Sequence, residues 1–131
     1  MSAGLMAYSV DLARISHAEA APYRSQCERY GEFLPNAPFY PVRFWWFAEV
    51  DRALADLGVK AVRLDDLWMG AEDGAQWSTE EVRRAAVQAR AVTTEQVQAL
   101  EDYSICESVQ TVLGWIRGAA EQGHGIVGFY H

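Results

Sequence analysis

Cysteine is scarce in this chain of 131 residues, and long apolar runs are absent. Cys27 and Cys106 are the only two cysteines, too few for a disulfide scaffold, and no basic segment followed by an apolar one opens the chain. We therefore expect a cytoplasmic protein with both thiols reduced. No apolar stretch reaches the roughly 18 to 20 residues that span a bilayer. The sequence thus predicts a soluble protein that is not embedded in a membrane.

Positive charge is also in short supply. The chain has 11 Lys and Arg residues against 18 Asp and Glu, for a net charge of −7, and Lys60 is its single lysine. Nucleic acids and anionic membranes are bound by clustered cations, so this balance argues against both as partners and favours a basic one. Half of the residues are hydrophobic and 22% are charged, as in folded domains. We expect one globular domain over residues 1–131.

Familiar chemical motifs are missing. The sequence has no phosphate-binding loop ending in Lys-Ser or Lys-Thr, no His-Glu-x-x-His, no Cys-x-x-Cys and no Gly-x-Ser-x-Gly. Its three histidines and two cysteines lack metal-ligand spacing, so neither a metal nor a cofactor is expected. Residues 123–128 match the letters of the dinucleotide fingerprint but follow a predicted helix and enter a strand, the reverse of the required order. Catalytic residues stay unassigned, and an enzyme is less expected than a binding protein.

Apolar alternation predicts strands at both ends of the chain. Residues 4–12 place Met6, Tyr8 and Val10 on one side of a strand, and residues 126–130 form an apolar run after a glycine-rich turn. The segment Val-Lys-Ala-Val-Arg-Leu at residues 59–64 predicts another strand. On the first strand, the opposite side carries Leu5, Ala7 and Ser9.

Helix signals fill the interior of the sequence. Pro22 favours a helix that begins there after a short turn, and the three prolines within residues 35–41 predict an extended connector. A helix over residues 44–57 ends at Gly58, and residues 70–74 predict a loop. Three capping boxes then predict three helices, the last over residues 105–122 and ended by Gly123; the cap pairs are Ser78 with Glu81, Thr93 with Gln96, and Ser104 with Glu107.

These elements favour an α+β fold. The expected architecture is a small sheet that includes the N- and C-terminal strands, with four to five helices covering one of its faces. Whether the terminal strands pair in parallel or antiparallel is left open. A doubly wound parallel sheet is less expected because strands and helices do not alternate regularly.

Two adjacent tryptophans separate on a helical wheel of about 100° per residue. Trp46 shares the apolar arc that continues to Leu57, whereas Trp45 points to the opposite side. Either a loop covers Trp45 or it anchors an interface, because aromatic residues with nearby arginine are common interface hot spots. The hypothesised interaction surface consists of Trp45, Glu49, Arg52 and Asp56.

Gly114 and Gly118 lie inside the last predicted helix, away from its apolar stripe. Each costs up to about 1 kcal/mol relative to alanine, so we expect another backbone to approach closely on that side. Packing within this fold is the favoured explanation. A homodimer built on these glycines, or on Trp45, is the alternative.

An acidic stretch with aromatic residues follows the predicted strand at 59–64. It is an ordinary solvated loop or part of a pocket between helices and sheet. In the second interpretation its carboxylates and tryptophans suit a cationic or sugar-like ligand. The residues assigned to that pocket are Asp65, Asp66, Trp68, Trp77 and Tyr8, and the loop also holds Glu72 and Asp73.

Three segments together resemble the YfbM-like family of bacterial proteins. They are Leu-Met-Ala-Tyr-Ser-Val-Asp-Leu at residues 5–12, Trp-Ser-Thr-Glu-Glu-Val at residues 77–82, and the helix end and apolar strand over residues 116–127. Residues 35–74 depart from that family's pattern. The resemblance implies a compact bacterial α+β protein, and it supplies no catalytic residues.

Two functional hypotheses follow. The first is a non-catalytic protein-interaction module, for example a regulatory or toxin-neutralising, immunity-like partner whose acidic surface occludes a basic active site. The alternative is a small-molecule-binding protein or small enzyme with a pocket between the helices and the sheet.

Overall fold

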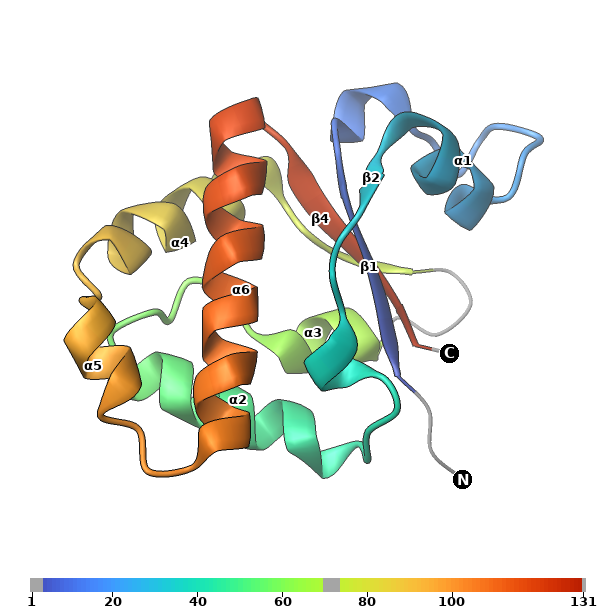
Figure 1. The fold of residues 1–131 in the computed structure, drawn as a ribbon. Coiled ribbons are helices and arrows are strands. Elements are labelled where there is room, and N and C mark those ends of the chain that lie inside the picture. The colour runs from blue at the N-terminus through green and yellow to red at the C-terminus, as the bar shows by residue number, and fades with distance from the viewer. Residues whose placement is uncertain (1–3, 70–73, 131) are drawn as a thin grey trace.

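Strands from the two ends of the chain pair at the centre of a four-stranded antiparallel sheet (Figure 1). The computed structural model describes residues 4–69 and 74–130, and within these ranges it has six α-helices. The α+β prediction is confirmed. The strands are β1 (Leu5–Val10), β2 (Glu32–Phe33), β3 (Ala75–Trp77) and β4 (Gly125–Tyr130). The helices are α1 (Tyr23–Tyr30), α2 (Trp45–Asp56), α3 (Leu64–Trp68), α4 (Thr79–Arg90), α5 (Thr94–Gln98) and α6 (Tyr103–Gln122), with 3-10 turns η1 (Leu12–Arg14) and η2 (Ala37–Phe39).

The strand order is β2-β1-β4-β3. β1 and β4 pair along their whole length, from Leu5 opposite Tyr130 to Val10 opposite Gly125. The pairing direction that the sequence left open is therefore antiparallel. β3 extends the sheet beside β4 and was not predicted, because three residues are too few to show an alternating pattern.

The two faces of the sheet are covered differently. Leu5 and Ala7 point into the main core, which α2 to α6 cover as expected. Tyr8 and Val10 point the other way, into a smaller cluster that includes Cys27 of α1. Figure 1 shows α1 alone among the helices on that side. Helices thus cover both faces, and not one face as predicted.

The predicted strand over residues 59–64 is wrong. Residues 59–63 form an irregular connector, and α3 begins at Leu64. The segment does pack into the core, since Val59, Val62 and Leu64 are buried, but none of the described strands pairs with it. Instead, Oε1 of Gln88 accepts hydrogen bonds from the N–H groups of residues 60 and 61 at 2.8 and 2.9 Å. A side chain satisfies the backbone groups that a neighbouring strand would otherwise bind.

The proline-rich connector is not extended throughout. Residues 37–39 form η2, with Pro38 in its first turn. Phe39 at the end of this turn is fully buried, and its ring lies 5.3 Å from that of Trp115 in α6. The connector is therefore anchored to the core.

Among the helices that the sequence predicted, the ends follow the sequence signals with one exception. The capping boxes at Ser78 and Thr93 are confirmed, each with both reciprocal hydrogen bonds. The box at Ser104 is wrong: Asp102 is the N-cap of α6, and its carboxylate accepts from the N–H of Ser104 and Ile105. Gly123 ends α6 in a left-handed conformation, with φ of +70°. Of the helices described, none is long and apolar enough to cross a membrane.

Candidate functional site

Trp45 lies in the first turn of α2 with 51% of its surface exposed, so no loop of residues 4–69 and 74–130 covers it fully. Its predicted outward orientation is confirmed, while its role in an interface stays a prediction. On the same helix, Arg52 Nη1 lies 3.4 Å from Oε2 of Glu49, and Asp56 is exposed. Exposed ion pairs of this kind contribute little to stability, so these side chains remain available to a partner.

Two further large apolar side chains next to α2 and α3 are exposed. Phe44, directly before α2, is 63% exposed, and Met69, directly after α3, is 68% exposed. The Phe44 ring lies 6.4 Å from that of Trp68, which precedes Met69 in the chain. We refer to Phe44, Trp45, Trp68 and Met69 as the aromatic surface. The helical wheel left Phe44 between two faces, and no sequence signal singled out Met69.

Trp68 connects this surface to the core. Its ring stacks on that of Phe47 at 5.7 Å and lies 5.3 Å from that of Tyr130 at the end of β4. Phe47 is fully buried. The exposed Phe44 therefore packs against Trp68, whose ring is held in place by Phe47 and Tyr130.

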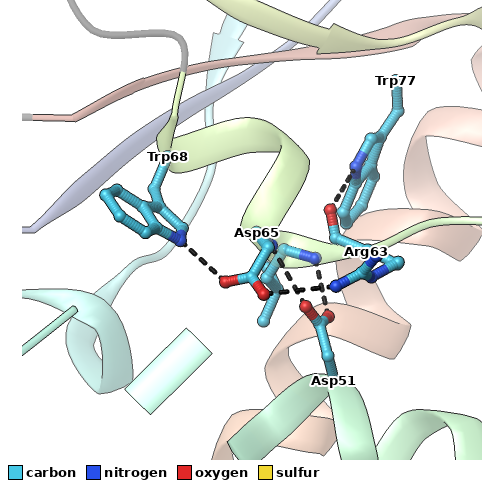
Figure 2. A network of polar contacts seen from close by, with 6 residues as sticks. Asp51, Arg63, Asp65, Trp68 and Trp77 are labelled. Atoms are coloured by element: carbon cyan, nitrogen blue, oxygen red, sulfur yellow. Dashed lines mark hydrogen bonds and ion pairs between the residues drawn. The ribbon is translucent and has the colours of Figure 1, made fainter. Parts of the chain in front are cut away.

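A polar network sets the position of Trp68 (Figure 2). The indole Nε1–H of Trp68 donates to Oδ1 of Asp65 at 2.8 Å, and Nη2 of Arg63 lies 3.3 Å from Oδ2 of the same carboxylate. The backbone N–H of Asp65 donates to Oδ2 of Asp51 at 3.1 Å. α2 and α3 are thereby tied together beneath the aromatic surface.

Asp51 is the most perturbed acid of this network. Burial raises the pKa of its carboxyl to about 6, although hydrogen bonds from the N–H groups of Leu64 and Asp65 act in the opposite direction. Desolvation of the charged form outweighs the two backbone donors. The network therefore contains a group that changes charge close to neutral pH.

The structure brings only part of the predicted ligand set together. Asp65, Trp68 and Trp77 meet around Arg63, whose carbonyl accepts from Nε1 of Trp77 at 2.9 Å. Trp77 is 1% exposed, so its indole is a buried structural group.

The other members of that set lie elsewhere. Asp66 is exposed. Tyr8 lies on the opposite face of the sheet, where its ring packs edge-on against Phe33 at 5.4 Å. Glu72 and Asp73 fall outside the described residues.

A groove of about 450 Å³ lies between α6 and the β1–β2 side of the sheet. Its presence corrects the expectation for Gly114 and Gly118: a Cβ atom built on either glycine meets no atom within 4 Å. No backbone of residues 4–69 and 74–130 approaches them, and they border open space. The groove is lined by Ser9, Glu32, Leu34, Pro35, Gln110, Thr111, Gly114, Trp115, Gly118, Ala119 and Gln122.

The sulfur and imidazole groups do not form a chemical centre in the described part of the chain. Cys27 is fully buried, and burial raises the pKa of its thiol to about 11, which disfavours the nucleophilic thiolate. Nδ1 of His124 lies 3.0 Å from Oγ of Ser9, a hydroxyl that is almost fully buried. Residues 4–69 and 74–130 hold no group of three His, Cys, Asp or Glu side chains placed to bind a metal.

Residues 16–131 match the model of a family described as a domain of unknown function, DUF7691. The chain belongs to this family. No curated protein and no solved structure matches it. The DUF7691 region contains the aromatic surface, the Asp51 network and all groove residues except Ser9. β1, which supplies Ser9, lies before it.

Proposed function

We propose that this chain is a non-catalytic interaction protein that binds a basic protein through the aromatic surface. The observation that carries the proposal is the adjacent exposure of Phe44 and Trp45, at 63% and 51%. Exposed aromatic side chains gathered at one place are typical of contact surfaces, and large aromatic residues supply much of the binding energy at interfaces. The cluster beneath Phe44 pre-orders the surface, which lowers the entropy lost on binding.

Charge defines the partner. The net charge of −7 favours association with a basic protein, because complementary potentials speed encounter and suppress acidic competitors. A cytoplasmic toxin with a basic, nucleic-acid-cleaving active site is one concrete form of such a partner, which would make the chain immunity-like. A basic regulatory target is the other.

Co-purification from the native host followed by direct titration tests the proposal. We expect a basic protein to be retained by the wild-type chain and lost with Trp45→Ala and Phe44→Ala. Tyr30→Ala is the matched control, since Tyr30 is a partly exposed aromatic on α1, on the other side of the sheet. Calorimetry with the purified partner should show at least a tenfold loss of affinity for the two surface variants only. Equal affinity of all three variants would contradict the proposal.

A small-molecule-binding function has support from a different place. The groove beside α6 lies between a helix and the sheet, as that alternative requires, but none of the residues predicted to bind a ligand lines it. Its volume falls within the roughly 300 to 1,000 Å³ of ligand pockets. The aromatic surface and the groove share no residue, so the two functions are separable by mutation.

A further inference from the structure

The groove beside α6 is maintained at a cost to helix stability. Gly114 and Gly118 lie well inside the 20-residue helix α6, where glycine is less favourable than alanine by about 1 kcal/mol. Alanine fits at both positions without a steric conflict, because the space above them is open. Packing therefore does not explain the two glycines. What they provide is room in the groove.

The walls of the groove are fixed by hydrogen bonds. Nε1 of Trp115 donates to the carbonyl of Pro35 at 2.8 Å, and Trp115 is 2% exposed. The N–H of Leu34 donates to the carbonyl of Ala7 in β1 at 2.8 Å. The segment after β2 is thus held against both α6 and the sheet, and the groove is pre-formed in the free protein.

One charge lines the groove. Glu32 is its single charged side chain, and this carboxylate has no ion-pair partner in residues 4–69 and 74–130. The remaining polar groups are neutral: the hydroxyls of Ser9 and Thr111 and the amides of two glutamines. Leu34 and Pro35 add apolar surface. A carboxylate beside apolar walls complements a molecule with one cationic end and an apolar body.

We propose that this groove binds a small organic amine, with its ammonium group at Glu32 and its apolar body over Gly114 and Gly118. The amine's N–H groups donate to the carboxylate and to neighbouring hydroxyl and amide oxygens. Its hydrocarbon part fills the space that alanine side chains would occupy. This site is separate from the aromatic surface, and its binding does not depend on the protein partner proposed above.

A matched set of three probes tests the charge requirement. Phenethylamine, 2-phenylethanol and phenylacetate each carry a two-carbon substituent on a phenyl ring. At neutral pH the first is a cation, the second is uncharged and the third is an anion. We expect phenethylamine at millimolar concentration to give saturable NMR shifts at the amides of Gly114 and Gly118 and at the Trp115 indole. The alcohol should bind more weakly and the acid not at all. Absence of saturable shifts with the amine, or equal binding of all three probes, overturns the proposal.

Variants locate the site. Glu32→Gln should reduce the affinity for phenethylamine at least tenfold, whereas Glu121→Gln, which removes the same charge from an exposed position of α6 outside the groove, should leave it unchanged. The double variant Gly114→Ala and Gly118→Ala should lose binding while its melting temperature rises. Equal effects of the two glutamine variants, or full binding by the double variant, would show that phenethylamine does not bind in the groove. A change in the sedimentation of the double variant without ligand would instead assign the groove to a second copy of the chain.

Discussion

Oδ1 of Asp51 accepts a hydrogen bond from the N–H of Leu64 at 2.6 Å, so a carboxylate on α2 caps the first turn of α3. The residue at the N-cap position of α3, Arg63, makes no side-chain cap of its own. A side chain 13 residues before Leu64 thus does what Ser, Thr or Asp does locally at other helices. This capping joins two helices, and through Asp65 it reaches Trp68 at the aromatic surface.

Replacement of Asp51 should change how stability depends on pH. The pKa of Asp51 rises from an ordinary value of 3.8 to about 6 in the folded protein, so the folded state takes up this proton before the unfolded state does. The contribution of Asp51 to stability is therefore fully present below the unfolded pKa and is lost as the pH rises through the folded one. Relative to Asp51→Asn, the wild type should gain about 1 to 2 kcal/mol between about pH 7 and pH 4, after allowance for partial exposure.

Urea unfolding of both proteins across this pH range measures the effect. Asp56→Asn serves as the control, because Asp56 is exposed on the same helix. A stability difference between wild type and Asp51→Asn that is independent of pH would show that the backbone donors balance burial, and a wild type that gains stability as the pH rises would show that they outweigh it.

Sequence periodicity and local caps predicted most of the helices and the terminal strands, because those signals act within a few residues. α3 was missed since its capping group, Asp51, comes from another helix. The apolar residues at 59–64 suggested a strand, but the side chain of Gln88 accepts the hydrogen bonds from the backbone there. A side chain that binds the backbone in place of a neighbouring strand is a tertiary contact, and a local sequence pattern does not predict it.

The features of the candidate sites that depend on a single helix were predicted from the sequence, and those that depend on tertiary packing were not. The helical wheel placed Trp45 on the surface because that orientation is a property of one helix. Tyr8 was grouped with Trp68, although the pleat of β1 turns Tyr8 to the other face of the sheet. The glycines of α6 were noticed, but only the fold shows open space beside them. The resemblance to the YfbM-like family stays a prediction, since the match to DUF7691 does not bear on it.

The corrected N-cap of α6 gives a direct comparison of two neighbouring residues. Asp102→Ala should lower the free energy of unfolding by about 1 kcal/mol, because the carboxylate that accepts from the N–H of Ser104 and Ile105 is lost. Ser104→Ala should have little effect on it. Chemical denaturation measures the free energy of unfolding of both variants. Ser78→Ala, which removes the N-cap of α4, should lower it by a similar amount to Asp102→Ala. A larger loss for Ser104→Ala would restore the capping box predicted there.

The two thiols should differ in reactivity. Cys27 is fully buried with a raised pKa, whereas Cys106 is partly exposed in the first turns of α6. A thiol-specific reagent such as a disulfide dye should therefore modify one thiol in the folded protein and two after unfolding. Cys106→Ser should abolish the reaction of the folded protein, and Cys27→Ser should leave it intact. Rapid modification of Cys27 in the folded state would mean that α1 opens readily from the sheet.

Two glycines, one inside α6 and one at its C-cap, should respond in opposite directions to alanine. Gly123 has a φ of +70°, which an L side chain adopts only with strain, so Gly123→Ala should destabilise the protein by about 1 kcal/mol. Gly114 has helical backbone and open space around its missing Cβ; Gly114→Ala should stabilise by up to about 1 kcal/mol through helix propensity. Thermal unfolding of the two variants beside the wild type gives both signs in one experiment. Destabilisation by Gly114→Ala would mean that something fills the space above it, and the groove would then have to be closed in solution.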